Sequence, residues 1–240
     1  MFLNRFLCNL YFFALTAATL VTAAGAAEFA APAAASISFN LFRNGTHIGT
    51  IQENFEIKDG VYRATSEAKA IGLFALAQRH PVLYTSTGDS TKDGLRPVRF
   101  EGRRNNTLAI AEFDWKSDKL TMNYDGQVQT APLSHATQDR LSIMYHLMHL
   151  VQSKPRTIEF NMTTARKLDR YRYDVNADVT VDTPLKRLNT LHLVKRREQG
   201  DTQTEIWLAP EFHNLPVKVL NIEENGVRYE QVVTRLEFKL

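Results

Sequence analysis

The stretch QDRLSIMYHLMHLV, residues 138–151, determines how the rest of the chain is interpreted. Its apolar residues recur at three- and four-residue steps, a spacing that gathers side chains on one face of an α-helix. The polar side chains fall together on the opposite face. They are Gln138, Asp139, Ser142, His146 and His149. We expect one central helix at 138–151, capped by a hydroxyl of Thr137 or Ser134 and ended by Pro155, with its polar face near water.

Segments with a period of two residues precede and follow this helix. Ile37, Phe39 and Leu41 alternate with polar neighbours, and Asn-Gly and Asp-Gly pairs at 44–45, 59–60 and 125–126 mark tight turns. The connections are too short for the crossover helices that parallel strands need. The sequence therefore predicts a mainly β fold of about 12 strands in one large curved antiparallel sheet, a barrel or half-barrel. The helix would plug an open end or lie in the concavity.

The first residues have the pattern of a secretory signal peptide. Arg5 gives a positive start, residues 6–21 are largely apolar, and Ala24, Ala26 and Ala27 offer small-residue cleavage sites. We predict a signal peptide at 1–27, a flexible lead at 28–35 and a single β domain at 36–240. The alternative is an uncleaved membrane anchor, because the apolar stretch can be extended to almost spanning length.

Cysteine usage and charge exclude several classes of protein. Cys8 is the single cysteine and lies in the predicted signal peptide, so the mature chain would have no disulfide and no thiolate nucleophile. The chain carries 29 basic and 26 acidic residues, which is close to balanced and predicts no nucleic-acid partner. The basic clusters at 103–104 and 195–197 adjoin turn signals and are interpreted as solvated hairpin ends.

The polar helix face is the best candidate for chemistry. Asp139, Ser142 and His146 are within helical reach of one another, but a nucleophilic serine needs a strained turn and oxyanion donors, which a mid-helix position lacks. A metal site at His146 and His149 would need further ligands in suitable geometry. There is no phosphate-binding glycine motif either. We therefore predict no catalytic residues, no metal and no cofactor, and the protein is not expected to be an enzyme.

Large apolar side chains have two interpretations. The run IGLFALAQ, at 71–78, is either a short core helix at one end of a barrel or the cover of a ligand cavity. If the barrel is hollow, several large residues would line it; if it is filled, they belong to the core. These residues are Leu73, Phe74, Leu76, Trp115, Tyr145, Met148 and Trp207.

Short motifs in the middle and last third of the chain carry a resemblance. They are GLRP at 94–97, RF at 99–100, FDW at 113–115, QDRLS at 138–142, WLAP at 207–210 and LPV at 215–217. From about Phe39 to about Leu236 the chain resembles a family of exported Gram-negative proteins known as domain of unknown function 3108. This resemblance implies the periplasm and an antiparallel β fold, and no activity. Residues 207–217 are also similar to a hairpin of the periplasmic lipoprotein carriers, whose half-barrel holds acyl chains.

Three functions remain open. We favour a non-catalytic periplasmic protein that binds an apolar or lipid-like ligand, such as a lipid or an acyl group. The alternative is an envelope scaffold with a filled core, which offers sheet edges or hairpin tips to a partner protein. A hydrolase that uses the polar helix face is the least favoured. Once its signal is cleaved, the protein would not be an integral membrane protein.

Overall fold

The computed structural model describes residues 32–78, 80–196 and 201–240. The predicted signal peptide and the first part of the predicted lead lie outside these residues. Fifteen strands form one sheet in the order β8-β7-β6-β5-β4-β3-β2-β1-β15-β14-β13-β12-β11-β10-β9. The two halves of the chain are thus two antiparallel meanders that meet where the first strand pairs with the last. In this pair, Ile37 of β1 lies opposite Leu236 of β15.

The first meander contains eight strands and one short helix. They are β1 (Ala34–Arg43), β2 (Thr46–Lys58), β3 (Val61–Ala70), α1 (Phe74–Ala77), β4 (Val82–Thr91), β5 (Gly94–Arg104), β6 (Thr107–Asp114), β7 (Lys119–Tyr124) and β8 (Gln127–Pro132). A short helix is present within the predicted segment 71–78, but it spans only Phe74–Ala77, and Leu73 and Leu76 are exposed rather than part of the core. The strand β1 begins at Ala34, two residues before the predicted start of the β domain, because Ala34 and Ala35 already pair with β2 and β15.

The second half of the chain contains α2 and the remaining strands, of which β9 precedes the helix. Its elements are β9 (Gln138–Asp139), α2 (Ser142–Leu150), β10 (Thr157–Thr163), β11 (Leu168–Asp182), β12 (Arg187–Lys195), β13 (Gln203–Ala209), η1 (Pro210–Phe212), β14 (Leu215–Ile222) and β15 (Arg228–Lys239). The predicted class, a large curved antiparallel sheet around one central helix, is confirmed, with more strands than expected. The sheet is open, because β8 and β9 are its two edges.

The tight turns follow the predicted glycine pairs. Asn44, Asp59 and Asp125 have φ values of 49°, 51° and 52°, and the glycine after each also has a positive φ. Two consecutive positive φ values define the turn whose twist matches that of paired strands. Asparagine, aspartate and glycine tolerate this conformation better than other residues, so these dipeptides set the register of the strands on either side.

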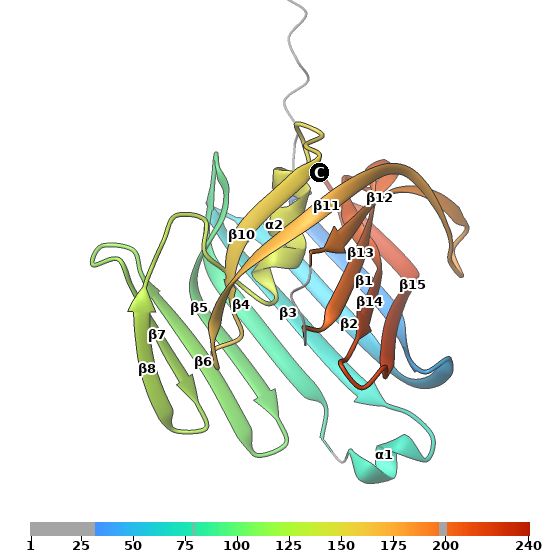
Figure 1. The fold of residues 1–240 in the computed structure, drawn as a ribbon, viewed down its shortest axis with the longest axis horizontal. Helices are drawn as coiled ribbons and strands as arrows, with labels where there is room; N and C mark the ends of the chain where they lie inside the picture. Colours follow the sequence, from blue (N-terminus) through green and yellow to red (C-terminus); the bar gives the residue numbers. More distant parts are fainter. Residues whose placement is uncertain (1–31, 79, 197–200) are drawn as a thin grey trace, which may run out of the picture.

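The helix α2 lies inside the curl of the sheet (Figure 1). On one side, Tyr145 and Met148 pack with residues of the first meander, and the Tyr145 ring stacks on Phe55 with 4.5 Å between centroids. On another side, Ile143 and Leu147 pack against the second meander. Fully burying a side chain as large as Leu147 contributes about 1.5–3 kcal/mol. Around the helix, the interior is therefore filled with side chains.

The helix begins later than predicted, which corrects the range 138–151. Gln138 and Asp139 form the short strand β9, which runs parallel to the end of β10. Asp139 Oδ1 then accepts hydrogen bonds from the backbone N–H groups of Leu141 and Ser142, both at 2.8 Å. The predicted caps do not act on the helix, because the Thr137 hydroxyl donates to the Ser134 carbonyl at 2.7 Å. A carboxylate thus satisfies the first free N–H groups of α2.

Among the described residues, no helix has the length and apolar character needed to cross a membrane.

Candidate ligand-binding site

The polar face of α2 is buried, which contradicts the expectation that it lies near water. Gln138, Asp139 and Ser142 are 0% exposed and His146 is 2% exposed. Of the five polar residues predicted on this face, His149 alone is partly exposed. A buried polar face needs hydrogen-bond partners, because an unsatisfied group costs about 1–3 kcal/mol. Strands β4 and β5 supply some partners and the turn before α2 supplies the others, whereas Gln138 Oε1 and His146 Nε2 have no partner among the described residues.

The strand β5 explains why polar side chains are needed there. Its pairing with β6 covers only Arg99 to Arg104, so the first residues of β5 have no strand on that side. The Leu95 N–H donates instead to His146 Nδ1 at 3.1 Å, and Gln138 Nε2 donates to the Leu95 carbonyl at 2.8 Å. Trp115 Nε1 donates to the Pro97 carbonyl at 2.6 Å. Three side chains thus take the place of the missing strand.

Gly94 allows the His146 ring to approach β5. Its φ is +101°, and a Cβ at this position would lie 2.5 Å from two atoms of the imidazole. Burial is the main cause that lowers the pKa of His146 from 6.5 to about 4, and the nearby His149 and His135 act in the same direction. The ring is therefore neutral at pH 7, as its role as acceptor from Leu95 requires.

Asp139 is the centre of a second buried network. Ser86 Oγ donates to Asp139 Oδ2 at 2.6 Å, and the Tyr62 hydroxyl lies 2.8 Å from Ser86 Oγ. Burial raises the pKa of Asp139, while hydrogen bonds from Ser86, Ser142 and Leu141 oppose this rise. The Ser142 hydroxyl accepts the Asp139 N–H at 3.0 Å. Ser142 and Asp139 thus bond to each other through backbone groups, and His146 Nδ1 is occupied by the Leu95 N–H, so the three side chains do not have the serine–histidine–carboxylate contacts of a catalytic triad.

Tyr145 links α2 to the strand β2. Its hydroxyl donates to Glu53 Oε2 at 3.0 Å. Burial raises the pKa of Glu53, and hydrogen bonds from Tyr145 and Ser66, together with the charge of Arg140, act against it. Arg140 is exposed. Its charge acts on the buried Glu53, and its side chain lines a hollow on the inner face of the sheet.

This hollow has a volume of about 640 Å³, and we call it the concave pocket. It lies between the inner faces of strands β4 to β7 and the turn that joins β10 to β11. Its lining residues are Tyr84, Phe100, Gly102, Arg104, Thr107, Ala109, Tyr124, Arg140, Thr164, Arg166 and Lys167. The strand residues belong to the same face as the core residues Phe100 and Ala111, so the pocket continues the surface that packs on α2 elsewhere.

Positive charge distinguishes the concave pocket. Its lining includes three arginines and one lysine, and no carboxylate. The Arg140 guanidinium lies 4.4 Å from the centre of the Tyr84 ring and donates to the Tyr84 hydroxyl at 3.1 Å. The Arg166 guanidinium lies 5.5 Å from the centre of the Tyr124 ring. Lys167 forms an ion pair with Asp169 at 2.6 Å, so the arginines provide most of the free charge.

The aromatic floor depends on a glycine. Tyr84 stacks on Phe100 with 5.8 Å between ring centroids. A Cβ on Gly102 would lie 2.9 Å from two atoms of the Tyr84 ring, so glycine leaves the space in which the ring lies across β5. The result is a flat apolar surface beside cationic groups. Such a surface suits a ligand with an apolar part and an anionic part.

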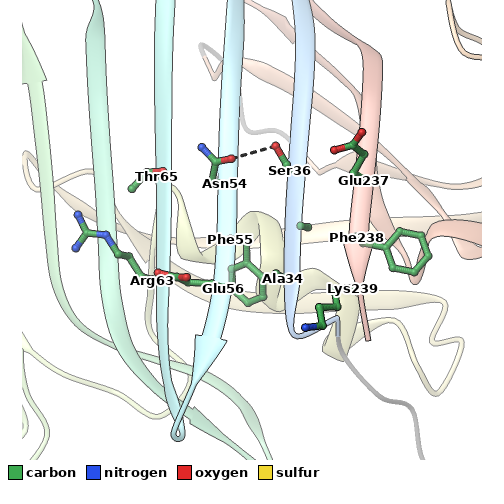
Figure 2. A pocket seen from close by; sticks show the side chains of 11 residues that line it. Ala34, Ser36, Asn54, Phe55, Glu56, Arg63, Thr65, Glu237, Phe238 and Lys239 are labelled. Atoms are coloured by element: carbon green, nitrogen blue, oxygen red, sulfur yellow. Dashed lines mark hydrogen bonds between the residues drawn. The ribbon is translucent and has the colours of Figure 1, made fainter.

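A different pocket, of about 470 Å³, lies across β15, β1, β2 and β3 (Figure 2). In this pocket Ser36 donates to Asn54 at 3.0 Å, so these two polar groups satisfy each other. Its charged lining residues have both signs. They are Glu56, Arg63, Glu237 and Lys239. The formal charges of these four side chains cancel.

The structure does not bring the seven predicted lining residues together. Leu73, Phe74 and Leu76 belong to the loop around α1 and are 83%, 41% and 76% exposed. Tyr145 and Met148 are buried and border a hollow of about 390 Å³ beside the end of α2. That any of these five contacts a ligand stays a prediction.

The two tryptophans have partners of their own. Trp115 donates a hydrogen bond to the Pro97 carbonyl of β5. Trp207 alternates along β13 with Ile206 and Leu208, which pack with Leu147 of α2, so its side chain lies on the opposite face of the strand and belongs to a different core cluster. There its ring stacks on His192 with 4.3 Å between centroids. A ligand contact by either tryptophan also stays a prediction.

The cations of the concave pocket are absent from the predicted site. The sequence interpretation places Arg104 at a solvated hairpin end, and Arg140 falls within the predicted helix 138–151 without a role. Arg166 gives no signal in the sequence beyond a basic residue near a turn. These residues come from three distant segments, and the pairing order of the strands brings them to one pocket. The order in which the strands pair cannot be read from the residues of any one segment.

A single curled and open antiparallel sheet, wrapped around one helix, defines the protein as a β-barrel-like protein. The model of the family described as a protein of unknown function, DUF3108, matches residues 36–232, and the chain belongs to this family. The resemblance drawn from the short motifs is therefore confirmed. No curated protein matches the chain.

Comparison with solved structures shows the fold in a protein of another family. A β-barrel-like protein of the domain of unknown function DUF1849 from Brucella abortus has a TM-score of 0.54 and 8% identity, with 87% of this chain and 99% of that chain covered. A candidate exported protein with a YmcC-like fold from Bacteroides fragilis has a TM-score of 0.32 and 10% identity, with 85% and 95% covered. A candidate lipoprotein from Parabacteroides distasonis has a TM-score of 0.32 and 8% identity, with 88% and 98% covered.

Proposed function

We propose that the protein is a non-catalytic binding protein of the periplasm, and that its concave pocket binds an amphiphile with an anionic head group. The observation that carries this proposal is the lining of the pocket, in which arginines without a carboxylate stand beside half-buried aromatic rings. The periplasmic address rests on the signal-like residues 1–27 and on the exported character of the family that the motifs resemble.

The arginines would hold the head group. A guanidinium presents several N–H donors in one plane, which matches the oxygens of a carboxylate or phosphate. Arg140 and Arg166 are held by ring contacts with Tyr84 and Tyr124, which limits the side-chain entropy that binding would cost. Walls of low dielectric constant strengthen the attraction relative to water.

The aromatic rings would contact the apolar part. Tyr84 and Tyr124 are half-buried, and Ala109 lies between them on the inner face of β6. A volume of about 640 Å³ falls within the range of small-molecule sites. It accommodates a head group with part of a chain, while the filled core around α2 leaves the remainder of a long chain outside.

A fluorescent fatty acid tests the proposal. The probe is 11-(dansylamino)undecanoic acid, and its methyl ester is the neutral control. We expect the acid to bind more tightly than the ester. We expect the variant Arg140→Gln/Arg166→Gln to bind the acid at least about tenfold more weakly, because a hydrogen bond to a charged group contributes about 1.5–3 kcal/mol and about 1.4 kcal/mol corresponds to tenfold in affinity.

The matched control is Arg235→Gln. Arg235 pairs with Glu237 on β15 and has a side chain that is 72% exposed, so its loss also removes one exposed cation but leaves the concave pocket intact. This variant should bind the probe like the wild type. Equal binding of acid and ester, or equal weakening by Arg235→Gln and by the pocket variant, would refute the assignment of the site.

A scaffold function is the second candidate, and the edge strand β8 supports it. β8 pairs with β7 on one side only, and Val128 on it is 63% exposed. An unpaired edge can accept a strand from a partner protein. Periplasmic crosslinking from position 128 tests this alternative. Recovery of a partner that is lost in Val128→Lys would favour it, since a charge on an edge strand opposes strand addition.

A further inference from the structure

A second hollow lies beside the concave pocket, at the edge of the sheet that β8 forms (Figure 1). We call it the edge hollow. Its volume is about 430 Å³, and it is lined by Tyr124, Asp125, Gln127, Val128, Gln129 and Arg166. Tyr124 and Arg166 also line the concave pocket. Their cation–π contact, with 5.5 Å between the guanidinium and the ring centre, therefore lies on the border between the two hollows.

The strand register places the glutamines of the edge hollow on the concave side of the sheet. Tyr124 of β7 pairs with Gln127 of β8, and Met122 pairs with Gln129. Residues directly opposite each other in an antiparallel pair share a face, and Met122 belongs to the core. Both glutamines therefore extend the inner surface that lines the concave pocket. A ligand in that pocket reaches them past Arg166 without crossing the sheet.

Contacts across the gap between the two meanders hold this border in place. Gln129 Nε2 donates to the Arg166 carbonyl, which ties β8 to the turn between β10 and β11. The Thr163 hydroxyl donates to Met122 Sδ at 3.1 Å, which ties the end of β10 to β7. Among the described residues, the side-chain amide of Gln127 has no hydrogen-bond partner. One glutamine thus supports the position of Arg166, and the other is available to a ligand.

The edge hollow differs from the concave pocket in its chemistry. The concave pocket presents three arginines and one lysine without a carboxylate. The edge hollow presents two side-chain amides, one carboxylate, one phenol and one guanidinium, which together include donors and acceptors. A hydroxyl group both donates and accepts hydrogen bonds, so the neighbouring hydroxyls of a polyol use both kinds of partner. An ammonium group only donates, and it would leave the amide N–H groups and Arg166 without acceptors.

We propose that the edge hollow binds a polyol, such as glycerol or a sugar, that is bonded to the anionic group of the ligand. The anion lies between Arg140 and Arg166, and the hydroxyls contact Gln127 and Asp125 on the other side of Arg166. This inference rests on the proposed function and narrows it, from any anionic amphiphile to one with a hydroxylated head group. Gln127, Val128 and Gln129 are exposed, so this end of the ligand stays in contact with water.

Two soluble phospholipids of equal charge test the proposal. They are dihexanoylphosphatidylglycerol, whose head group carries hydroxyls, and dihexanoylphosphatidylmethanol, whose head group carries none. Isothermal titration calorimetry, at concentrations below micelle formation, measures their binding to the wild type, to Gln127→Ala and to the control Gln152→Ala. Gln152 is exposed, like Gln127, and lines neither the concave pocket nor the edge hollow.

We expect the wild type and the control to bind the phosphatidylglycerol at least about threefold more tightly than the phosphatidylmethanol, because only the first reaches the amide of Gln127. Gln127→Ala should bind both lipids with the affinity that the wild type has for the phosphatidylmethanol. Equal binding of the two lipids by the wild type, or a preference that persists in Gln127→Ala, would overturn the polyol inference. Tighter binding of dihexanoylphosphatidylethanolamine than of the phosphatidylglycerol would also overturn it, in favour of an ammonium group beside Asp125.

The polyol inference and the proposed function fail separately. If both lipids bind equally and Arg140→Gln/Arg166→Gln weakens both, the concave pocket binds an anion and the polyol inference alone fails. If Arg140→Gln/Arg166→Gln binds the lipids like the wild type, or if neither lipid binds the wild type, both fail.

Discussion

At the scale of single residues, Gly94 supports the contact between α2 and β5. Replacing it by alanine would place a methyl group 2.5 Å from the His146 ring, in a backbone conformation with φ +101° that alanine disfavours. We expect Gly94→Ala to lower the free energy of unfolding by about 2–4 kcal/mol, since strain and a displaced hydrogen bond add. Urea denaturation measures the change.

The control for this prediction is Gly126→Ala. Gly126 also has a positive φ, +84°, but a Cβ there meets nothing within 4 Å. Gly126→Ala should therefore lower the free energy of unfolding only through backbone strain, by about 1 kcal/mol. Equal destabilisation by the two substitutions would show that the His146 contact contributes nothing.

His146 makes stability depend on pH. Its pKa falls to about 4 in the folded protein, mainly because of burial, whereas the unfolded value is about 6.5. The folded state then binds fewer protons than the unfolded state between these values, so its contribution is fully present above about pH 6.5 and is lost as the pH falls to about 4. A pKa difference of this size corresponds to about 3 kcal/mol in the free energy of unfolding. Glu53 and Asp139 have raised pKa values and change stability in the opposite direction.

Comparison with His146→Gln isolates the effect of the histidine, because glutamine can still accept a hydrogen bond from Leu95 and does not titrate. We expect the wild type to lose stability relative to His146→Gln as the pH is lowered from about 7 to about 4.5. Urea denaturation of both proteins at the two pH values gives the difference. A constant difference would mean that His146 is not the buried neutral group that the structure shows.

The residue types on the polar helix face could be predicted from the sequence, but their burial could not. Periodicity places Gln138, Ser142 and His146 on one side of the helix, and the polarity of these residues then predicts that this side faces solvent. The opposite holds because β6 ends its pairing at Arg99 and leaves the backbone of Leu95 without a partner strand. Only the strand register shows that gap, so the sequence gives no sign of it.

At the scale of elements, Asp139 joins β9 to α2. Its carboxylate accepts from the N–H groups of Leu141 and Ser142 and from the Ser86 hydroxyl. Asp139→Ala would leave these three donors without an acceptor in a buried site, and we expect a loss of about 3 kcal/mol in the free energy of unfolding. Thermal or urea denaturation tests this value.

The matched variant Thr137→Val separates the two capping assignments. Thr137 was expected to cap the helix, but its hydroxyl bonds to Ser134 and not to the first turn of α2. Its substitution should cost less than that of Asp139. A larger effect for Thr137→Val than for Asp139→Ala would contradict the assignment of Asp139 as the cap.

The boundaries of the elements were predictable to different degrees. Turns such as Asn44-Gly45 were predictable because asparagine and glycine tolerate positive φ in any fold. The start of α2 was not, because the pairing of Gln138 and Asp139 with β10 takes these two residues from the helix. Contact with a distant strand overrides a local helical pattern in this case.

At the scale of the whole molecule, alternation along each strand was enough to predict a curved antiparallel sheet around a helix. The pairing of β1 with β15, which joins the two meanders, depends on the ends of the chain and has no local signal. The same applies to the concave pocket, whose arginines at 104, 140 and 166 meet only after the sheet has curled. The fold could be predicted in class, whereas the candidate site required the three-dimensional structure.

Native mass spectrometry of the protein purified from the periplasm tests the proposed function most directly. We expect the wild type to carry a co-purified anionic amphiphile, seen as an additional mass that organic solvent removes. The variant Arg140→Gln/Arg166→Gln should be folded and largely free of that mass. A wild-type protein without any bound amphiphile, or a variant that retains the same ligand in the same proportion, would contradict the assignment of the concave pocket.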